Sequence, residues 1–276
     1  MSRLIHIESL DDQRVALFRN VRDQDLRASD GMFMVETERI IRRLVETPHE
    51  IEAMLLSDRC AAALEDVLPL VPEDVPVHVA GRDLVREIIG YQVHRGALAA
   101  VRRPPAAAGL ESVLGPPGTR ERLRLLLLEG VIHTDNVGSL FRIAAGFSVD
   151  AVVLDPTSSD PLLRKAIRVS MGHALSVPWM HSADWAADLR RLRTEWDVDL
   201  VAAETGLGAV PVWEIPHAPR QAVIVGSEGH GLCRETLQAC ASICRIPMDD
   251  AVPSLNVATA AGVIGYELWK RERPQP

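Results

Sequence analysis

The chain has 276 residues, which is long for a single compact core and sufficient for two domains. Its 38 acidic residues outnumber 30 basic ones and give a net charge of −8, which excludes a generic polyanion binder. No run of about 18 apolar residues is present, and the N-terminus lacks a signal-peptide segment, so we expect a cytoplasmic protein without a membrane span.

The cysteines and the basic residues limit the chemistry further. The four cysteines show neither a Cys-x-x-Cys pair nor a histidine at metal spacing, so we expect free thiols and no metal site. The basic residues are nearly all arginine, with lysine only at Lys165 and Lys270. A guanidinium group binds phosphate through paired hydrogen bonds and stacks on bases, so a local arginine surface could still bind RNA. High-GC coding bias would produce the same excess of arginine.

Residues 1–103 alternate between short apolar strands and amphipathic helices, which is typical of a small α/β domain. We expect a helix after Asp12, strands at 33–35, 51–56, 75–79 and 97–101, and helices at 36–46 and 84–89. Residues 104–120 are rich in proline, glycine and alanine, and we interpret them as a linker between two domains.

Residues 121–276 show a stronger α/β pattern. The continuous apolar run Leu123–Leu128 indicates a central parallel strand that is buried on both faces. This alternation predicts a doubly wound parallel sheet, whose ligands bind beyond the carboxyl ends of the strands. Further strands are expected at 151–154, 175–179, 198–203, 221–225 and 242–247, and helices at 139–146, 161–170, 184–196 and from residue 255.

The first polar motif follows the strand that ends at Leu128. Asn136 begins the pattern Asn-x-Gly-x-x-x-Arg, and Arg142 ends it near the start of the next helix. Leu140 and Ile143 belong to the core face of this helix, and Arg142 points away from most of that face. Taken singly, a turn residue and a solvated surface charge explain these two polar residues better than a functional role.

A glycine-rich motif, Gly-Ser-Glu-Gly-His-Gly-Leu, occupies residues 226–232 directly after the strand at 221–225. Its three glycines permit a close approach of the backbone to a ligand. The spacing differs from the Gly-x-Gly-x-x-Gly of dinucleotide-binding proteins, and the Gly-Lys-Ser/Thr of a phosphate-binding loop is missing. A nicotinamide-dependent oxidoreductase is therefore disfavoured.

The third motif lies before the final helix, in which small residues recur at helical spacing. It consists of Ile-Pro-Met at 246–248 and Ser-Leu-Asn-Val at 254–257. Ser254 and Asn256 stand where the loop becomes a helix, so their side chains and the free N–H groups there can cap the helix or face a ligand. Taken alone, capping and helix packing explain the stretch about as well as a ligand site does.

In order and spacing, the three motifs resemble those of the SpoU (TrmH) family, which are S-adenosylmethionine-dependent RNA 2′-O-ribose methyltransferases of the SPOUT superfamily. The resemblance is close over residues 123–270. Residues 30–103 are more loosely similar to the family's ribosomal-protein-like RNA-binding domain, and the sequence at 168–172 also looks like a family feature. The resemblance implies a deep trefoil knot at about residues 223–269, a homodimer whose active sites are completed across the subunit interface, and an rRNA or tRNA substrate.

The resemblance also implies two sets of site residues. S-adenosylmethionine would be held by residues of the last two motifs, namely Gly226, Ser227, Ile246, Met248 and Leu255. The catalytic set would comprise Arg142 and the polar residues that position it and the ribose, namely Asn136, Glu228, Ser254 and Asn256.

The chemistry of methyl transfer leaves the role of Arg142 open. A sulfonium ion activates its own leaving group, so the protein must mainly align the ribose hydroxyl and remove its proton. In the sequence, no carboxylate pair or histidine stands out as a base. A guanidinium group, with a pKa above about 12, is a poor base, so we expect Arg142 to bind the neighbouring phosphate or to lower the pKa of the hydroxyl. A phosphate oxygen could take the proton. A non-catalytic RNA-binding protein that kept the fold is the alternative.

Overall fold

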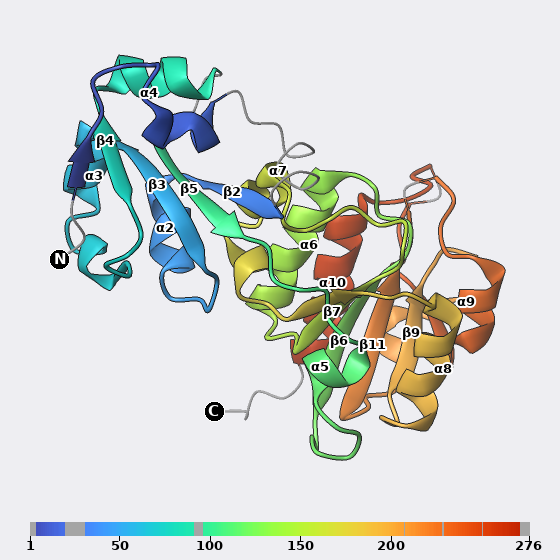
Figure 1. Ribbon diagram of the computed structural model, residues 1–276. Helices are drawn as coiled ribbons and strands as arrows, with labels where there is room; N and C mark the ends of the chain where they lie inside the picture. Colours follow the sequence, from blue (N-terminus) through green and yellow to red (C-terminus); the bar gives the residue numbers. More distant parts are fainter. Residues whose placement is uncertain are drawn as a thin grey trace, which may run out of the picture. The chain divides into compact units, whose positions relative to one another are not determined.

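The computed structural model describes residues 4–19, 31–90, 96–206, 208–227, 229–249 and 251–270. The chain forms two compact units, and Figure 1 labels most of their helices and strands. The first unit comprises residues up to Pro105 together with residues 162–176, and the second comprises residues 106–161 and the chain from Val177 onward. The division after Pro105 lies near the expected boundary, but residues 162–176 were expected in the second domain.

The first unit is built on a mixed five-stranded sheet with the order β1-β4-β3-β5-β2. β4 pairs in parallel with β1 and β3, whereas β5 pairs antiparallel with β3 and β2. The strands are β1 (Leu4–His6), β2 (Met32–Glu36), β3 (Ile51–Ser57), β4 (Val77–Ala80) and β5 (Ala97–Arg102). The helices are η1 (Gln13–Phe18), α2 (Glu38–Leu44), α3 (Asp58–Ala63), η2 (Leu68–Leu70) and α4 (Arg82–Ile89).

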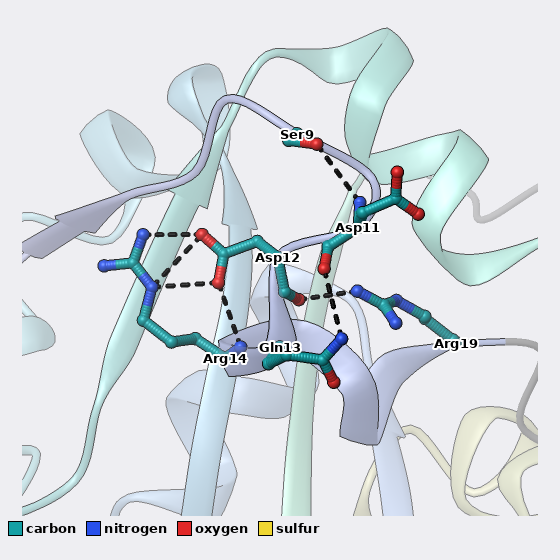
Figure 2. A network of polar contacts seen from close by, with 6 residues as sticks. All are labelled: Ser9, Asp11, Asp12, Gln13, Arg14 and Arg19. Atoms are coloured by element: carbon teal, nitrogen blue, oxygen red, sulfur yellow. Dashed lines mark hydrogen bonds and ion pairs between the residues drawn. The ribbon is translucent and has the colours of Figure 1, made fainter.

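A polar network surrounds η1, as Figure 2 shows. Asp12 caps η1 by accepting a hydrogen bond from the backbone N–H of Arg14 at 2.9 Å, and its carboxylate pairs with the Arg14 guanidinium group at 2.6 Å. The hydrogen bond from Arg14 lowers the pKa of Asp12 to about 2. At the other end, the N–H of Arg19 bonds to the carbonyl oxygen of Ala16, three residues back. The expected helix after Asp12 is therefore a short 3₁₀ turn.

Residues 162–176 pack within the first unit. α7 (Arg164–Val169) lies against β2, and the Arg164 guanidinium group is 3.2 Å from a carboxylate oxygen of Glu36. At the turn after α7, Gly172 has a φ of 83°, and a Cβ there would lie 3.0 Å from a side-chain atom of α2. Glycine is therefore needed both for the backbone conformation and for the close approach to α2.

The second unit is built on a seven-stranded sheet with the order β10-β12-β9-β11-β6-β7-β8, in which every pair of neighbours is parallel. This confirms the expected parallel α/β sheet. The strands are β6 (Leu123–Leu128), β7 (Ala151–Leu154), β8 (Trp179–His181), β9 (Asp199–Ala203), β10 (Val210–Pro211), β11 (Arg220–Val225) and β12 (Ser242–Arg245). The helices are α5 (Leu110–Leu114), α6 (Thr134–Gly146), α8 (Trp185–Thr194), η4 (Val212–Glu214), α9 (Arg234–Ala239) and α10 (Val257–Lys270). The short η3 (His173–Leu175) belongs to the first unit.

Two expectations for this region are wrong. The strand expected at 175–179 begins only at Trp179, because Pro178 cannot donate a ladder hydrogen bond. The segment expected as a linker at 104–120 contains α5, whose Leu110 and Leu114 are buried in the core of the second unit. The flanking prolines and glycines concealed this short amphipathic helix in the sequence.

The small residues of α10 are used within the chain. α10 packs against α6, beside which it lies in Figure 1. A Cβ at Gly262 would lie 3.7 Å from Ile143 on α6. A Cβ at Gly265 would lie 2.8 Å from Trp269, whose ring packs at 6.1 Å from that of Phe147, the residue directly after α6. The glycines therefore allow α6 and Trp269 to approach the α10 backbone closely.

Within the part of the chain that the structure describes, none of the helices combines the length and apolar character that a membrane crossing needs.

Candidate functional site

A cavity of about 500 Å³ lies where β9, β11 and β12 end, at the carboxyl edge of the parallel sheet. Its walls come from the residues that follow each strand and from the start of α10. A cavity of this size at this edge matches the usual ligand site of parallel α/β sheets. The residues expected to bind the cofactor all line this larger cavity: Gly226, Ser227, Ile246, Met248 and Leu255.

The glycine loop, described at residues 226, 227 and 229–231, folds tightly on itself beside the larger cavity. The N–H of Gly231 donates a hydrogen bond to the carbonyl oxygen of Ser227 at 3.1 Å. A Cβ at Gly226 would lie 2.4 Å from the carbonyl carbon of Gly231 and 2.8 Å from the backbone nitrogen of Leu232. Because these are backbone atoms, only glycine fits at position 226 while the loop stays closed.

Glu204 lines the larger cavity and was missed in the sequence. Its carboxylate accepts the N–H of Leu232 at 3.1 Å and the N–H of Thr205 at 2.9 Å, so it joins the end of β9 to the end of the glycine loop. The available signal was its place directly after the expected strand at 198–203, because ligands bind beyond the carboxyl ends of such strands.

A second, smaller cavity of about 240 Å³ adjoins the first. The loop after β6 supplies residues 130–133 to its wall, and Asn136 lies at its side. Ser227, His230 and Val257 line this cavity and the larger one as well. The site is therefore a pair of adjoining cavities with a shared wall.

Asp155, at the end of β7, fixes the loop that lines the smaller cavity. Its carboxylate accepts the N–H of Gly130 at 3.0 Å and the N–H of Ser158 at 2.8 Å, and the Ser158 hydroxyl accepts the N–H of Val131 at 3.0 Å. Burial alone would raise the pKa of Asp155, but the hydrogen bonds from Ser158, Thr157 and Gly130 outweigh it and hold the pKa below its usual value.

Glu129, the residue after β6, ties the far end of the glycine loop to the sheet. Its buried carboxylate accepts the N–H of Cys233 at 2.6 Å and the indole N–H of Trp185 at 2.8 Å. It also accepts the hydroxyl proton of Thr236 on α9. The chain is thus anchored on both sides of the glycine loop, because β11 precedes the loop and Glu129 bonds to Cys233 shortly after it.

Asn136 and Asn256 join the first motif to the third. The side-chain amide of Asn256 donates to the Asn136 side-chain oxygen at 2.9 Å. The Asn256 oxygen accepts the N–H groups of Ala258 at 3.0 Å and Thr259 at 3.3 Å. Asn256, and not Ser254, therefore caps α10. Ser254 is exposed and lines the larger cavity.

Arg142 is the predicted residue that the structure does not bring to the cavities. It is exposed on α6 and is not among the described residues that line either cavity. Glu228, also in the predicted catalytic set, lies outside the described residues. One chain thus brings Asn136 and Ser254 to the cavities, and Asn256 is joined to them by its hydrogen bond to Asn136.

The described residues contain no group of His, Cys, Asp and Glu side chains arranged to hold a metal ion. Cys60, Cys233, Cys240 and Cys244 are free thiols, as expected. Burial raises the pKa of Cys244, which lines the larger cavity, to about 12, so it stays protonated near neutral pH.

Residues 124–266 match the sequence model of the SpoU rRNA Methylase family. The chain belongs to the SpoU family. An uncharacterized tRNA/rRNA methyltransferase of Mycobacterium bovis is 38% identical over 264 residues, which cover 93% of this chain and 88% of that protein. The 23S rRNA (guanosine-2′-O-)-methyltransferase RlmB of Acinetobacter baylyi is 28% identical over 230 residues, which cover 82% and 92% of the two chains. The resemblance to SpoU/TrmH RNA methyltransferases is thereby confirmed.

Solved structures share the fold of nearly the whole chain. The crystal structure of an AdoMet-bound rRNA methyltransferase from Sinorhizobium meliloti superposes with a TM-score of 0.80, covering 98% of this chain and 99% of that one at 18% identity. An RNA 2′-O ribose methyltransferase structure gives a TM-score of 0.77 at 23% identity, with 98% and 99% covered. At these identities the likeness shows a shared α/β fold.

Proposed function

We propose that this SpoU protein transfers a methyl group from S-adenosylmethionine to a ribose 2′-hydroxyl in structured ribosomal or transfer RNA. The observation that carries this proposal is the pair of adjoining cavities at the carboxyl edge of the parallel sheet. The larger cavity is lined by all five residues expected to bind the cofactor, and the smaller one is lined by Asn136. The name of the RlmB relative supports the 2′-hydroxyl as the methylated group.

The larger cavity fits a bent S-adenosylmethionine. Its volume of about 500 Å³ lies within the usual range for a small-molecule site. The missing side chain of Gly226 leaves backbone close to the ligand, and Ile246 and Leu255 offer apolar contacts beside it. S-adenosylmethionine would supply a methyl group bound to a positively charged sulfur, which leaves as a neutral thioether.

Positioning the ribose is the main task of the chain's own residues. Asn136 and Asn256 hold each other at the edge of the smaller cavity, where they orient the nucleotide. Arg142 binds the phosphate beside the target ribose through its planar guanidinium group. Fixing the hydroxyl in line with the methyl group supplies much of the rate enhancement, because alignment removes an entropic barrier.

A homodimer completes this site. Val263 and Tyr266 on α10 are 41% and 50% exposed, and Trp213 on η4, which packs against α10, is 54% exposed. Large apolar side chains gathered on neighbouring elements are typical of a protein interface. Gly262 and Gly265 face α6 and Trp269 within the same chain. The support for the dimer therefore comes from the larger exposed residues. In the dimer, Arg142 of the partner subunit reaches the smaller cavity.

The C-terminal segment forms the deep trefoil knot of the SPOUT superfamily. Two features of the second unit support it. β12 lies between β9 and β10, although it follows both in the sequence. The chain then returns as α10 to pack against α6, β9 and β11.

The first unit binds the RNA. Arg39 on α2 and Arg168 on α7 are exposed, and both helices pack against β2. Exposed arginines on neighbouring helices give a local positive surface in a chain whose net charge is −8. Binding through such a surface should weaken steeply as salt concentration rises.

Two measurements test the proposed function. S-adenosylhomocysteine should raise the melting temperature of the protein, whereas NAD should leave it unchanged, because a ligand stabilises only a fold that binds it. Labelled methyl groups should then pass from S-adenosylmethionine to RNA from cells that lack the gene. Cofactor and RNA binding without any transfer would favour the alternative, a non-catalytic RNA-binding protein.

A further inference from the structure

The wall between the two cavities is where methyl donor and acceptor must meet. If the cofactor occupies the larger cavity and the target ribose enters the smaller one, the methyl group crosses at the residues that line both. These are Ser227, His230 and Val257. Valine carries no proton-accepting group and a serine hydroxyl is a weak base, whereas histidine accepts a proton near neutral pH.

The glycine loop holds His230 at this junction. His230 stands between Gly229 and Gly231, whose φ angles are 103° and 65°. Both glycines adopt backbone conformations that other residues rarely reach, and the bond from the N–H of Gly231 to Ser227 closes the turn. Ser227 in turn packs on the loop after β6, since a Cβ at Gly130 would lie 3.3 Å from its side chain. The bond between Gly231 and Ser227 and the contact of Ser227 with Gly130 therefore place His230 beside both cavities.

We propose that His230 is the proton acceptor of the methyl transfer. This inference rests on the proposed function and assigns the step for which the sequence offered no base. As the ribose oxygen bonds to the methyl carbon, the bond from that carbon to sulfur breaks, and its electron pair stays on the sulfur of S-adenosylhomocysteine. The proton of the 2′-hydroxyl passes to an imidazole nitrogen of His230 and is later released to water.

Among the residues that the structure describes, the other titratable groups of the two cavities are less suited to this role. His133 lines only the smaller cavity, and Glu204 and Arg245 line only the larger one. The Glu204 carboxylate already accepts two backbone N–H groups, and the buried Cys244 thiol has its pKa raised to about 12. A guanidinium group is a poor base, so we assign phosphate binding to Arg142 and proton acceptance to His230.

The test is single-turnover methyl transfer with saturating cofactor and RNA, measured between about pH 5.5 and pH 9. A His230→Asn variant should lose at least about 10²-fold in rate, the usual scale for a positioned base. It should also lose the rise in rate with pH that the wild type shows as the base is deprotonated. Added imidazole should restore part of the rate, because a small base can enter beside the shortened side chain. The matched variant His133→Asn should keep the pH dependence.

His230→Gln serves as a second variant, and cofactor affinity is measured for each protein by calorimetry. His230 is exposed, so both variants should fold and bind S-adenosylmethionine within about threefold of the wild type. Transfer by His230→Asn at near wild-type rate with the same pH profile would overturn the proposal. So would loss of the pH dependence in a Glu228→Gln variant instead, or loss of cofactor binding in both His230 variants. A wild type that transfers no methyl group would contradict the proposed function itself.

Discussion

The Asn136 side chain accepts a hydrogen bond from Asn256 at 2.9 Å, although 120 residues separate the two in the sequence. Asn256 also caps α10, whose first residue, Val257, lines both cavities. The bond therefore sets the start of α10 relative to the start of α6. It is a physical link between two motifs that the sequence shows only as separate patterns.

Replacing either asparagine by alanine should destabilise the fold, and the two effects should not add. Asn256→Ala loses the helix cap and the bond to Asn136, so we expect a cost of about 1–2 kcal/mol. Asn136→Ala should cost about 1 kcal/mol, and the double variant should show a coupling of about 0.5–1.5 kcal/mol in denaturant unfolding. Ser254→Ala, at an exposed position, should stay within about 0.5 kcal/mol of the wild type. Strict additivity would show that the bond contributes nothing.

Gly226→Ala should weaken cofactor binding while the sheet stays folded. The added Cβ would lie 2.4 Å from a backbone atom of Gly231, so the glycine loop must open. If closing the loop around the cofactor then costs about 1–3 kcal/mol of strain, affinity for S-adenosylmethionine should fall by about 5- to 150-fold in calorimetry. Gly146→Ala is the matched control, since a Cβ there meets nothing within 4 Å. Unchanged affinity in Gly226→Ala would move the cofactor away from this loop.

Arg142→Ala should separate binding from transfer. Because Arg142 is exposed on α6 and lines neither cavity of its own chain, affinity for S-adenosylmethionine should stay within about twofold. Single-turnover transfer should fall by at least about 10²-fold. Arg142→Lys keeps the charge but loses the planar fork, so we expect little recovery. Near-normal transfer by Arg142→Ala would return this residue to a solvated helix surface.

Mixed dimers test which subunit supplies Arg142. A chain with Arg142→Ala should pair with a chain carrying Gly226→Ala to rebuild one intact site, so the mixture should transfer methyl groups although each variant alone is impaired. No gain on mixing would place Arg142 in the site of its own subunit.

Charges on the exposed face of α10 should disrupt the dimer. Val263→Asp and Tyr266→Asp each place a carboxylate in an apolar interface, where an unpaired charge is costly to bury. In light scattering, the wild type should have the mass of two chains and these variants the mass of one. Leu70→Asp, at a 62% exposed position in the first unit, should remain dimeric. A wild type with the mass of one chain would contradict the dimer.

Asp155 should make stability depend on pH in a defined window. Its pKa is lowered in the folded protein, so its stabilising effect is complete above the unfolded value of about 4 and is lost as pH falls through the folded value. Asp155→Asn should therefore cost about 1–3 kcal/mol at pH 7, and the difference from the wild type should shrink below about pH 4. A constant difference between pH 7 and pH 3 would rule out this origin.

The sequence predicts best where one physical signal dominates. The apolar runs of β6 and β7 fix their limits, because a strand buried on both faces needs apolar residues throughout. The sequence did not predict α5, because the prolines and glycines around it are typical of a linker. The strand expected at 175–179 begins only at Trp179, because Pro178 cannot donate a ladder hydrogen bond. Residues 162–176 pack with the first unit through the contacts of α7 with β2. Local sequence patterns do not predict contacts between such distant segments.

The site shows the same contrast between features that a local sequence pattern predicts and features that depend on contacts between distant segments. Gly226, Ile246 and Leu255 were found because motif spacing marks them, and they share one cavity. His230 lies in the glycine-rich motif without being marked by its glycine spacing, and Glu204 lies outside the three motifs. Only the fold shows that both line a cavity. The asparagine pair likewise depends on a contact between distant segments.

The most direct test of the account is the position of the methyl group on the RNA. RNA from cells that lack the gene is incubated with the protein and labelled S-adenosylmethionine, and is then hydrolysed in alkali. Alkaline cleavage needs a free 2′-hydroxyl, so a methylated ribose blocks it and leaves the label in a dinucleotide. We predict a labelled dinucleotide, lost in the Arg142→Ala variant. Label in mononucleotides would indicate methylation of a base and would contradict the proposed function.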